Sequence, residues 1–142
     1  MRRTGECLCG AVKFTATLTK PEIQACHCVQ CQKWTGGGPL YVCNITDIAF
    51  EDDDALARYR ASAWGERVFC ATCGSTIMWK MQDRSPNSVA SGLLNDQSGL
   101  TVTQEIFIDH RPDWLPPQAA ATQSTEAQEQ AKLAAYLSGG GA

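Results

Sequence analysis

The sequence predicts a small, mainly β fold that is held together by bound metal. Three observations support this prediction. A length of 142 residues and a mass of 15.4 kDa suit one compact core with at most a short appendage. Short segments of strand-forming residues alternate with turns that contain glycine or proline. Eight cysteines are present, and seven of them fall in tight clusters.

The clearest strand pattern lies in residues 5–18. Val12, Phe14 and Ala16 alternate with polar residues, which is typical of a strand with one buried face. Gly10 lies between two halves of this region, and glycine permits the tight backbone turn that a metal-binding knuckle needs. We therefore expect a strand over this stretch, with its cysteines in a turn.

Further elements follow in short steps along the chain. Residues 32–35 are expected to form a short helical turn, which three glycines and a proline in residues 36–39 then end. In the last expected strand, Ile106 and Ile108 alternate with Glu105. The remaining expected strands, in chain order, cover residues 40–50, 55–59, 67–69, 76–80, 89–94 and 104–108.

The composition changes after the two prolines at 116–117. We therefore expect one zinc-binding domain over residues 1–117 and an appendage over residues 118–142, which is rich in alanine and glutamine. Within the appendage, residues 125–137 are predicted to form a helix with Thr125 as its N-cap.

Charge and hydropathy exclude several classes of function. Twelve basic and 15 acidic residues give a net charge of −3, which argues against a protein that binds nucleic acid by neutralising phosphates. No apolar run is long enough for a membrane-spanning helix, and no apolar stretch follows the basic N-terminus as in a secretory signal. We expect a cytoplasmic protein. The oligomeric state cannot be predicted.

The cysteine spacing favours metal binding over disulfides. A disulfide between cysteines only two or three residues apart would be strained, whereas a turn can direct both thiolates to one ion. A reducing compartment also works against a disulfide scaffold. Buried thiols without a role are the third interpretation. The clusters are Cys7 and Cys9, then Cys26, Cys28 and Cys31, then Cys70 and Cys73.

Seven clustered thiols divide naturally into one site of four and one of three. Zinc is the expected metal because thiolates at this spacing suit its tetrahedral coordination, although iron would also accept four thiolates. Two zinc ions per chain are then expected. The segment 26–31 can close on a metal from one loop and would leave a fourth position open, as in catalytic zinc sites. The two outer pairs would form a structural site. Alternatively, Cys43 closes the site of three, but its apolar strand favours a core position.

Several other residues are candidates for roles near the metal. Three thiolates around Zn²⁺ carry a formal charge of −1, which a nearby cation would offset, although a solvated surface position is expected for each basic candidate. His27 is a candidate general base or a group that supports the metal ligands, although the inward aim of its neighbours favours a ring that points away. His110 is expected in a surface loop. Trp34 suits a pocket wall or the core, and Ser75 a hydrogen bond to backbone near the zinc. The basic candidates are Lys33, Arg58, Arg60 and Arg67.

Four motifs in this order resemble those of the glutathione-dependent formaldehyde-activating enzyme family, over roughly residues 5–114. They are Gly5-x-Cys7-x-Cys9-Gly10-x-Val12, Cys26-His27-Cys28-x-x-Cys31-x-x-x-x-Gly36, Phe69-Cys70-x-x-Cys73-Gly74-Ser75, and Ile106-Phe107-Ile108-Asp109 with Pro112 and Trp114. The chain differs from the family after Trp114, where Leu115-Pro116-Pro117 leads into alanine-rich sequence.

The resemblance implies a fold, a division of the metals and a reaction. It implies several coiled antiparallel sheets, an arrangement called a β-tent. It implies a carbon–sulfur lyase that joins glutathione or a similar small thiol to formaldehyde or another small aldehyde, in the namesake giving S-hydroxymethylglutathione. A non-catalytic binding module and a redox or metal-labile thiol protein are the alternatives. By analogy, the structural zinc is held by Cys7, Cys9, Cys70 and Cys73, and the catalytic zinc by Cys26, Cys28 and Cys31.

Overall fold

The computed structural model describes residues 1–82, 87–118 and 120–139. The predicted mainly β fold is confirmed, with 43% of these described residues in strands and 19% in helices. The chain forms two compact units, of which the first contains residues 1–22 and 42–100 and the second residues 23–41 and the chain from 101 onward. The predicted boundary at residue 117 stays a prediction.

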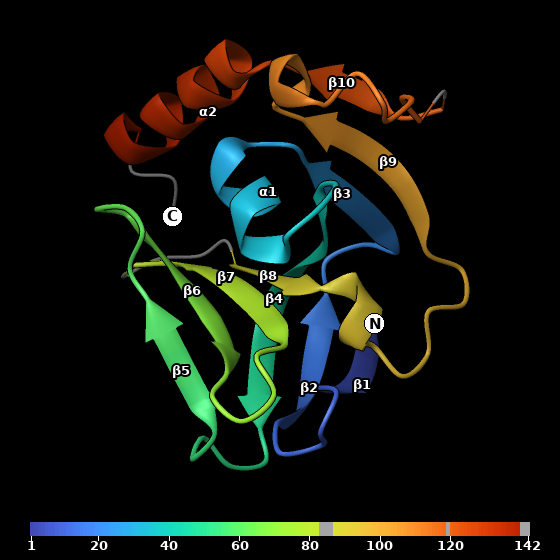
Figure 1. The fold of residues 1–142 in the computed structure, drawn as a ribbon, viewed down its shortest axis with the longest axis vertical. Coiled ribbons are helices and arrows are strands. Elements are labelled where there is room, and N and C mark those ends of the chain that lie inside the picture. Colours follow the sequence, from blue (N-terminus) through green and yellow to red (C-terminus); the bar gives the residue numbers. More distant parts are fainter. Residues whose placement is uncertain (83–86, 119, 140–142) are drawn as a thin grey trace. The chain divides into compact units, whose positions relative to one another are not determined.

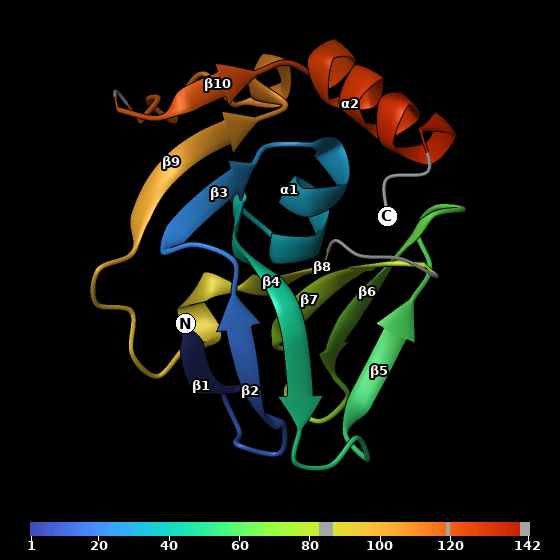
Figure 2. The ribbon, with the colours of Figure 1, turned by 180° about the vertical axis from the view of Figure 1, so that it is seen from behind.

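The first unit is built on antiparallel strands in the order β1-β2-β4-β8-β7-β6-β5 (Figure 1). Figure 2 shows β2, β4 and β5 of the same unit from behind. A short 3₁₀ turn, η1 (Ser91–Leu93), follows β8. The strands are β1 (Arg2–Glu6), β2 (Lys13–Leu18), β4 (Leu40–Phe50), β5 (Leu56–Tyr59), β6 (Gly65–Cys70), β7 (Thr76–Met81) and β8 (Asn87–Ala90).

The core of the first unit contains the residues that the alternation pattern predicts. Val12, Phe14 and Ala16 are at most 2% exposed, which confirms the buried face of β2. The ring of Phe14 packs edge-on against Phe50 on β4, with ring centroids 6.1 Å apart. Cys43 is completely buried, as its apolar strand predicts. Val68, Ile77 and Val89 complete the centre of this core.

Two of the predicted strands are interrupted in the structure. The stretch 5–18 is divided between β1 and β2 by a turn in which Gly10 adopts a φ of +79°, a left-handed conformation that glycine accepts without strain. The stretch predicted as a strand over 89–94 ends at Ala90 and continues as η1. In this turn the Leu94 amide donates to the Ser91 carbonyl, so the last residues of the stretch leave the ladder.

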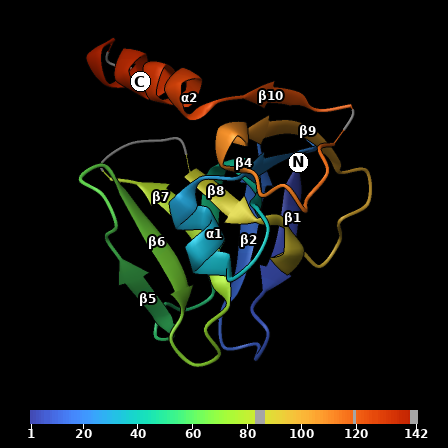
Figure 3. The same ribbon diagram turned by 45° about the horizontal axis from the view of Figure 1, so that its top comes forward.

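The second unit combines three strands with two helices (Figure 3). Its strand order is β10-β9-β3, and β9 pairs with β10 in parallel, an exception to the expected antiparallel arrangement. A 3₁₀ turn, η2 (Ile108–His110), follows β9. The other elements are β3 (Glu22–Cys26), α1 (Val29–Thr35), β9 (Thr101–Ile106), β10 (Thr122–Ser124) and α2 (Glu126–Ser138).

α1 ends and α2 begins where the sequence predicts, while α1 begins earlier than predicted. α1 extends the turn predicted at 32–35 and ends at Gly36, whose φ is +80° and whose amide donates to the Gln32 carbonyl. α2 confirms the predicted C-terminal helix, and Thr125 is its N-cap in a reciprocal pair of hydrogen bonds with Gln128. Among the described residues, no helix combines the length and the apolar character that crossing a membrane requires.

β9 ends two residues earlier than the alternation at 104–108 predicts. Phe107 has a φ of +57°, a left-handed conformation that is strained for a residue other than glycine, and this turns the chain from β9 into η2. Glu105 is 2% exposed, so this acidic residue is buried although it alternates with Ile106 and Ile108 in sequence.

Candidate metal centres

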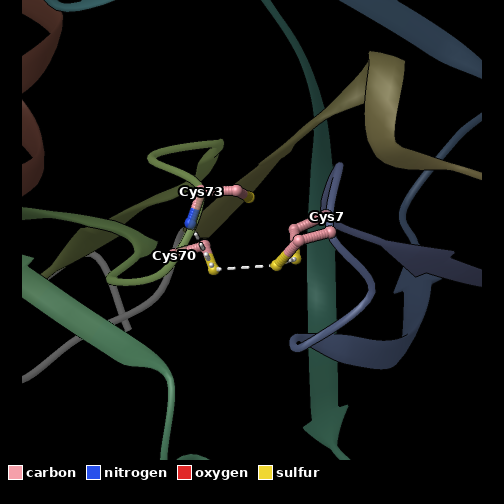
Figure 4. A group of neighbouring side chains, drawn as sticks. Cys7, Cys70 and Cys73 are labelled. Atoms are coloured by element: carbon pink, nitrogen blue, oxygen red, sulfur yellow. Dashed lines mark hydrogen bonds between the residues drawn. The ribbon is translucent and has the colours of Figure 1, made fainter.

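Four cysteine side chains of the first unit meet in one place, and we call them the four-cysteine group. Their sulfur atoms lie within 4.8 Å of one another. Two come from the turn after β1 and two from the end of β6 and the turn that follows it (Figure 4). The members are Cys7, Cys9, Cys70 and Cys73.

The spacing of these sulfur atoms fits zinc. The Sγ atom of Cys9 lies 3.7 Å from that of Cys7 and 3.9 Å from that of Cys70. A tetrahedron of sulfur atoms about 2.3 Å from a central zinc has edges of about 3.8 Å. None of the eight cysteines forms a disulfide, and these two sulfur separations are too long for one. The donor set is therefore that of a closed, tetrahedral thiolate site.

The turn after β1 presents its sulfurs through backbone hydrogen bonds. The Cys7 amide donates to the Val12 carbonyl at 3.0 Å, and the Gly10 amide donates to the Cys7 carbonyl at 3.1 Å. The Val12 amide also points at the Cys7 sulfur, 3.3 Å away. A donor aimed at sulfur stabilises the thiolate form, so this turn is shaped for a metal ligand.

The turn after β6 follows the same plan. The Cys70 amide donates to the Ser75 carbonyl, and the Gly74 amide donates to the Cys70 carbonyl. The Cys73 amide lies 3.5 Å from the Cys70 sulfur, and Gly74 has a φ of +79°. The Ser75 hydroxyl accepts from the Leu8 amide at 3.1 Å and lies 3.2 Å from the Cys73 sulfur. The backbone-bonding role predicted for Ser75 is confirmed, and it links the two turns.

The four thiols differ in how readily they ionise. Hydrogen bonds from the hydroxyl and amide of Ser75 lower the pKa of Cys73 to about 5. Burial opposes ionisation of Cys7, but the Val12 amide and two neighbouring thiols outweigh it and lower its pKa. The Ala11 amide favours ionisation of Cys9, yet desolvation and three neighbouring thiols raise its pKa to about 11. A full set of four thiolates therefore needs a cation to balance their charge.

Three cysteines of the second unit form another close set, the three-cysteine group. Cys26 ends β3, Cys28 is the N-cap of α1, and Cys31 lies within α1. Their sulfur atoms also lie within 4.8 Å of one another. The Cys31 amide donates to the Cys28 sulfur at 3.3 Å, so the start of the helix fixes the spacing of these two ligands.

Exposure differs among the three cysteines. Cys26 and Cys31 are buried, whereas Cys28 is half-buried. Hydrogen bonds with the other two thiols, together with burial, raise the pKa of Cys26. Within the described residues no fourth side chain joins this group, and Cys43 lies apart in the core of the first unit. Three sulfurs fit a tetrahedral metal whose fourth position is left to another ligand.

Glu105, which the sequence did not single out, contacts the residue between Cys26 and Cys28. His27 is completely buried, and its Nε2 atom lies 2.9 Å from a carboxylate oxygen of Glu105. The ring of His27 is therefore directed at Glu105 on β9. The sequence marks Glu105 only as an acidic residue within a strand, which is usually a sign of a solvated face.

A third set of potential ligands joins η2 to the start of α2. Nε2 of His110 lies 2.7 Å from Glu126 and 3.9 Å from Asp109, and Asp109 also accepts from the Glu126 amide at 2.8 Å. The hydrogen bond with Glu126 raises the pKa of His110, which is about one-third exposed rather than fully solvated. These contacts are those of an ion pair and a capped helix start, and they attach α2 to η2.

The predicted basic residues have varied surroundings. The surface position expected for Arg67 is wrong, because this residue is 5% exposed within β6. Arg58 pairs with Glu66 at 3.1 Å, and Arg60 donates to backbone carbonyls two and three residues ahead. Lys33 is exposed in the last turn of α1, as expected. Trp34 is half-buried, which leaves its two interpretations open.

Comparison with known proteins yields one family and several relatives. The family model described as "Glutathione-dependent formaldehyde-activating enzyme" matches residues 2–110. A protein of Schizosaccharomyces pombe named as an uncharacterized lyase is 26% identical over 110 residues, which cover 77% of this chain and 80% of the relative. A protein of Halomonas elongata named "Putative glutathione-dependent formaldehyde-activating enzyme" is 29% identical over 124 residues, or 78% of each chain.

A crystal structure of a Rhodobacter sphaeroides protein from structural genomics shares the fold. The two structures superpose with a TM-score of 0.56 at 16% sequence identity. The match covers 88% of this chain and all of the other.

Proposed function

The chain belongs to the glutathione-dependent formaldehyde-activating enzyme family, and from this premise we propose that it is a zinc-dependent carbon–sulfur lyase. Its substrates would be a small thiol such as glutathione and a small aldehyde such as formaldehyde. The names of the two relatives, one a lyase and one a glutathione-dependent enzyme, support this reaction class. All seven clustered cysteines lie within the matched residues.

We propose different tasks for the two cysteine groups, with two zinc ions per chain. The four-cysteine group would hold a structural zinc, because four thiolates complete its coordination. The three-cysteine group would hold the catalytic zinc. The observation that carries this proposal is the convergence of three sulfurs without a fourth described ligand, with Cys28 only half-buried. A substrate atom can then take the remaining position.

The chemistry follows from this arrangement. Bound zinc lowers the pKa of a thiol ligand and polarises a carbonyl oxygen. In the addition, the thiolate sulfur of the substrate forms a bond to the carbonyl carbon. The carbonyl electron pair moves to oxygen, which takes up a proton and becomes the hydroxyl of the adduct. Three cysteine thiolates repel an approaching thiolate, and exposed Lys33 on α1 is the cation of this helix that would offset their charge.

We propose the cytoplasm as the location of this reaction. Eight cysteines outside disulfides suit a reducing compartment, which keeps thiols reduced.

Replacement of one ligand of the three-cysteine group tests the proposal. We expect Cys28→Ser to lower kcat/KM for glutathione plus formaldehyde by about 100-fold or more, because it removes a proposed zinc ligand. Cys43→Ala is the matched control, since Cys43 is a buried thiol outside both groups. It should keep kcat/KM within about two-fold of the wild type. Turnover that survives in Cys28→Ser without its zinc would contradict the proposal and favour a binding module.

A further inference from the structure

Glu105 on β9 is a buried carboxylate with an unusually complete set of partners. Its Oε1 atom lies 2.9 Å from Nε2 of His27. Its Oε2 atom accepts from the Gln118 amide at 2.8 Å and from the side chain of Gln123 at 3.2 Å. The guanidinium of Arg111 lies 3.9 Å from the same oxygen. At 2% exposure, Glu105 therefore meets donors from three separate segments of the second unit.

His27 lies between two members of the three-cysteine group and is held to β9 twice. A carboxylate only accepts hydrogen bonds, so the Nε2 atom of His27 is the donor to Glu105. The His27 amide donates to the Ile106 carbonyl at 3.0 Å. The other ring nitrogen, Nδ1, is buried and has no hydrogen-bond partner among the described residues. Glu105 is thus the polar contact that sets the direction of this ring.

The opposite side of the loop is fixed by α1. The side-chain amide of Gln32 donates to the carbonyls of His27 and His110, both at 2.7 Å. The residue between Cys26 and Cys28 is therefore held through its amide, its carbonyl and its ring. None of these three contacts involves a sulfur atom, so none of them competes with metal binding by the thiols.

A buried carboxylate at position 105 lowers the stability of the fold unless its hydrogen bonds offset the loss of hydration. Burying a charge is unfavourable, and only paired, hydrogen-bonded carboxylates persist in protein interiors. A glutamine of the same shape could not replace it, because a carboxamide accepts at one end only. The donors of His27, Gln118 and Gln123 approach both ends of the group, so at least one donor would face an NH₂.

We propose that Glu105 is a positioning residue for the three-cysteine group, acting through His27 to set the geometry in which Cys26 and Cys28 meet a metal. This inference rests on the proposed function in one respect, because it requires that the three-cysteine group binds zinc. It adds that the metal affinity of this group depends on a carboxylate whose hydrogen bonds go to His27, Gln118 and Gln123 rather than to a cysteine.

The test compares zinc affinity at the two cysteine groups in the full-length protein. Chelator competition on Glu105→Gln should show at least a ten-fold weaker zinc at the three-cysteine group, as for other changes to groups that orient metal ligands. Zinc at the four-cysteine group should be unchanged, because its ligands lie in the first unit. With Co²⁺ as the probe, the sulfur-to-cobalt absorption of the three-cysteine group should also shift.

Two further variants separate positioning from a general loss of stability. Gln104→Ala is the matched control, because Gln104 is the neighbour of Glu105 on β9 and bonds Gln24 on β3 at 2.7 Å. It removes a link between the same two strands and should leave both zinc affinities within two-fold of the wild type. Gln123→Ala removes one donor and keeps Glu105, so it should weaken zinc at the three-cysteine group by two- to five-fold even if Glu105→Gln does not fold.

The outcomes distinguish this inference from the proposed reaction. Equal zinc affinity at the three-cysteine group in the wild type, Glu105→Gln and Gln123→Ala would overturn the positioning role, even if turnover is present. Selective weakening in a protein that shows no turnover would support the positioning role and contradict the proposed reaction. A wild-type three-cysteine group that binds neither zinc nor cobalt would overturn both.

Discussion

The four-cysteine group and the three-cysteine group both consist of cysteine sulfurs, but they differ in how far apart their cysteines lie in sequence. The first draws its sulfurs from two turns that are 61 residues apart in sequence, between Cys9 and Cys70. The second draws all its sulfurs from one segment of six residues, Cys26 to Cys31. A metal in the four-cysteine group would join two segments that are distant in sequence. A metal in the three-cysteine group would join residues that are already close neighbours along the chain.

The two groups therefore differ in what a bound metal would contribute to the protein. Joining distant segments removes conformational freedom from the unfolded chain, so a metal bound by the four-cysteine group would contribute to folding. In the three-cysteine group the residue between Cys26 and Cys28 is instead held by hydrogen bonds, from its ring to Glu105 and from Gln32 to its carbonyl. In the proposed enzyme, the fourth position of a metal held by these three sulfurs would serve the substrate.

Loss of the four-cysteine group should have the largest effect on stability. We expect Cys70→Ala to release one zinc and to lower the free energy of unfolding by several kcal/mol, up to about 10 kcal/mol. Cys43→Ala, at another fully buried thiol of the same unit, should cost only about 1 kcal/mol and keep all zinc. Thermal unfolding with metal analysis compares the two. Similar stability losses in the two variants would show that the four-cysteine group has no structural role.

Ser75 should matter less, because it supports two turns without binding metal. Ser75→Ala removes the acceptor of the Leu8 amide and the hydroxyl beside Cys73. We expect a loss of about 1 kcal/mol in stability and about ten-fold in zinc affinity at the four-cysteine group. Ser98→Ala, on an exposed loop of the same unit, is the control and should leave zinc affinity unchanged. Unaltered affinity in Ser75→Ala would mean that the turns hold their sulfurs alone.

The smallest effect concerns the attachment of α2. The pKa of His110 is raised in the folded state by Glu126, so the pair contributes stability that is fully present below the ordinary histidine value of about 6.5. This contribution is lost as the pH rises through the raised pKa. In pH-dependent unfolding, Glu126→Gln should lower stability by less than about 1 kcal/mol, and only on the acidic side.

Glu129→Gln, on the same helix, is the control for this pH dependence, since Glu129 contacts Ser124 and Lys132 rather than a histidine. A difference between wild type and Glu126→Gln that stays constant from about pH 6 to pH 9 would contradict the assignment to His110.

Features that depend on local sequence were predictable. The buried face of β2 follows from period-two alternation, and α2 follows from a capping residue ahead of helix-forming sequence. The cysteine pairs follow from their spacing and the glycines beside them, since each turn is made of consecutive residues. The geometry of both cysteine groups agrees with the predicted partition, while the metals themselves stay a prediction.

Features that depend on distant contacts were not predictable. His27 and Glu105 are 78 residues apart, and neither residue type in its local pattern indicates a buried pair. β10 has only three residues and no apolar alternation, so the sequence does not indicate its parallel pairing with β9. The burial of Arg67 likewise depends on packing rather than on its neighbours in sequence. A single sequence therefore identifies the ligands of a site better than the residues that orient them.

The metal content of the purified protein tests the partition into two groups most directly. Elemental mass spectrometry on protein prepared without added metal should give about two zinc ions per chain, one for each cysteine group. The same measurement on Cys28→Ser should give about one, held by the four-cysteine group. One zinc or less in the wild type, or two in Cys28→Ser, would contradict the account.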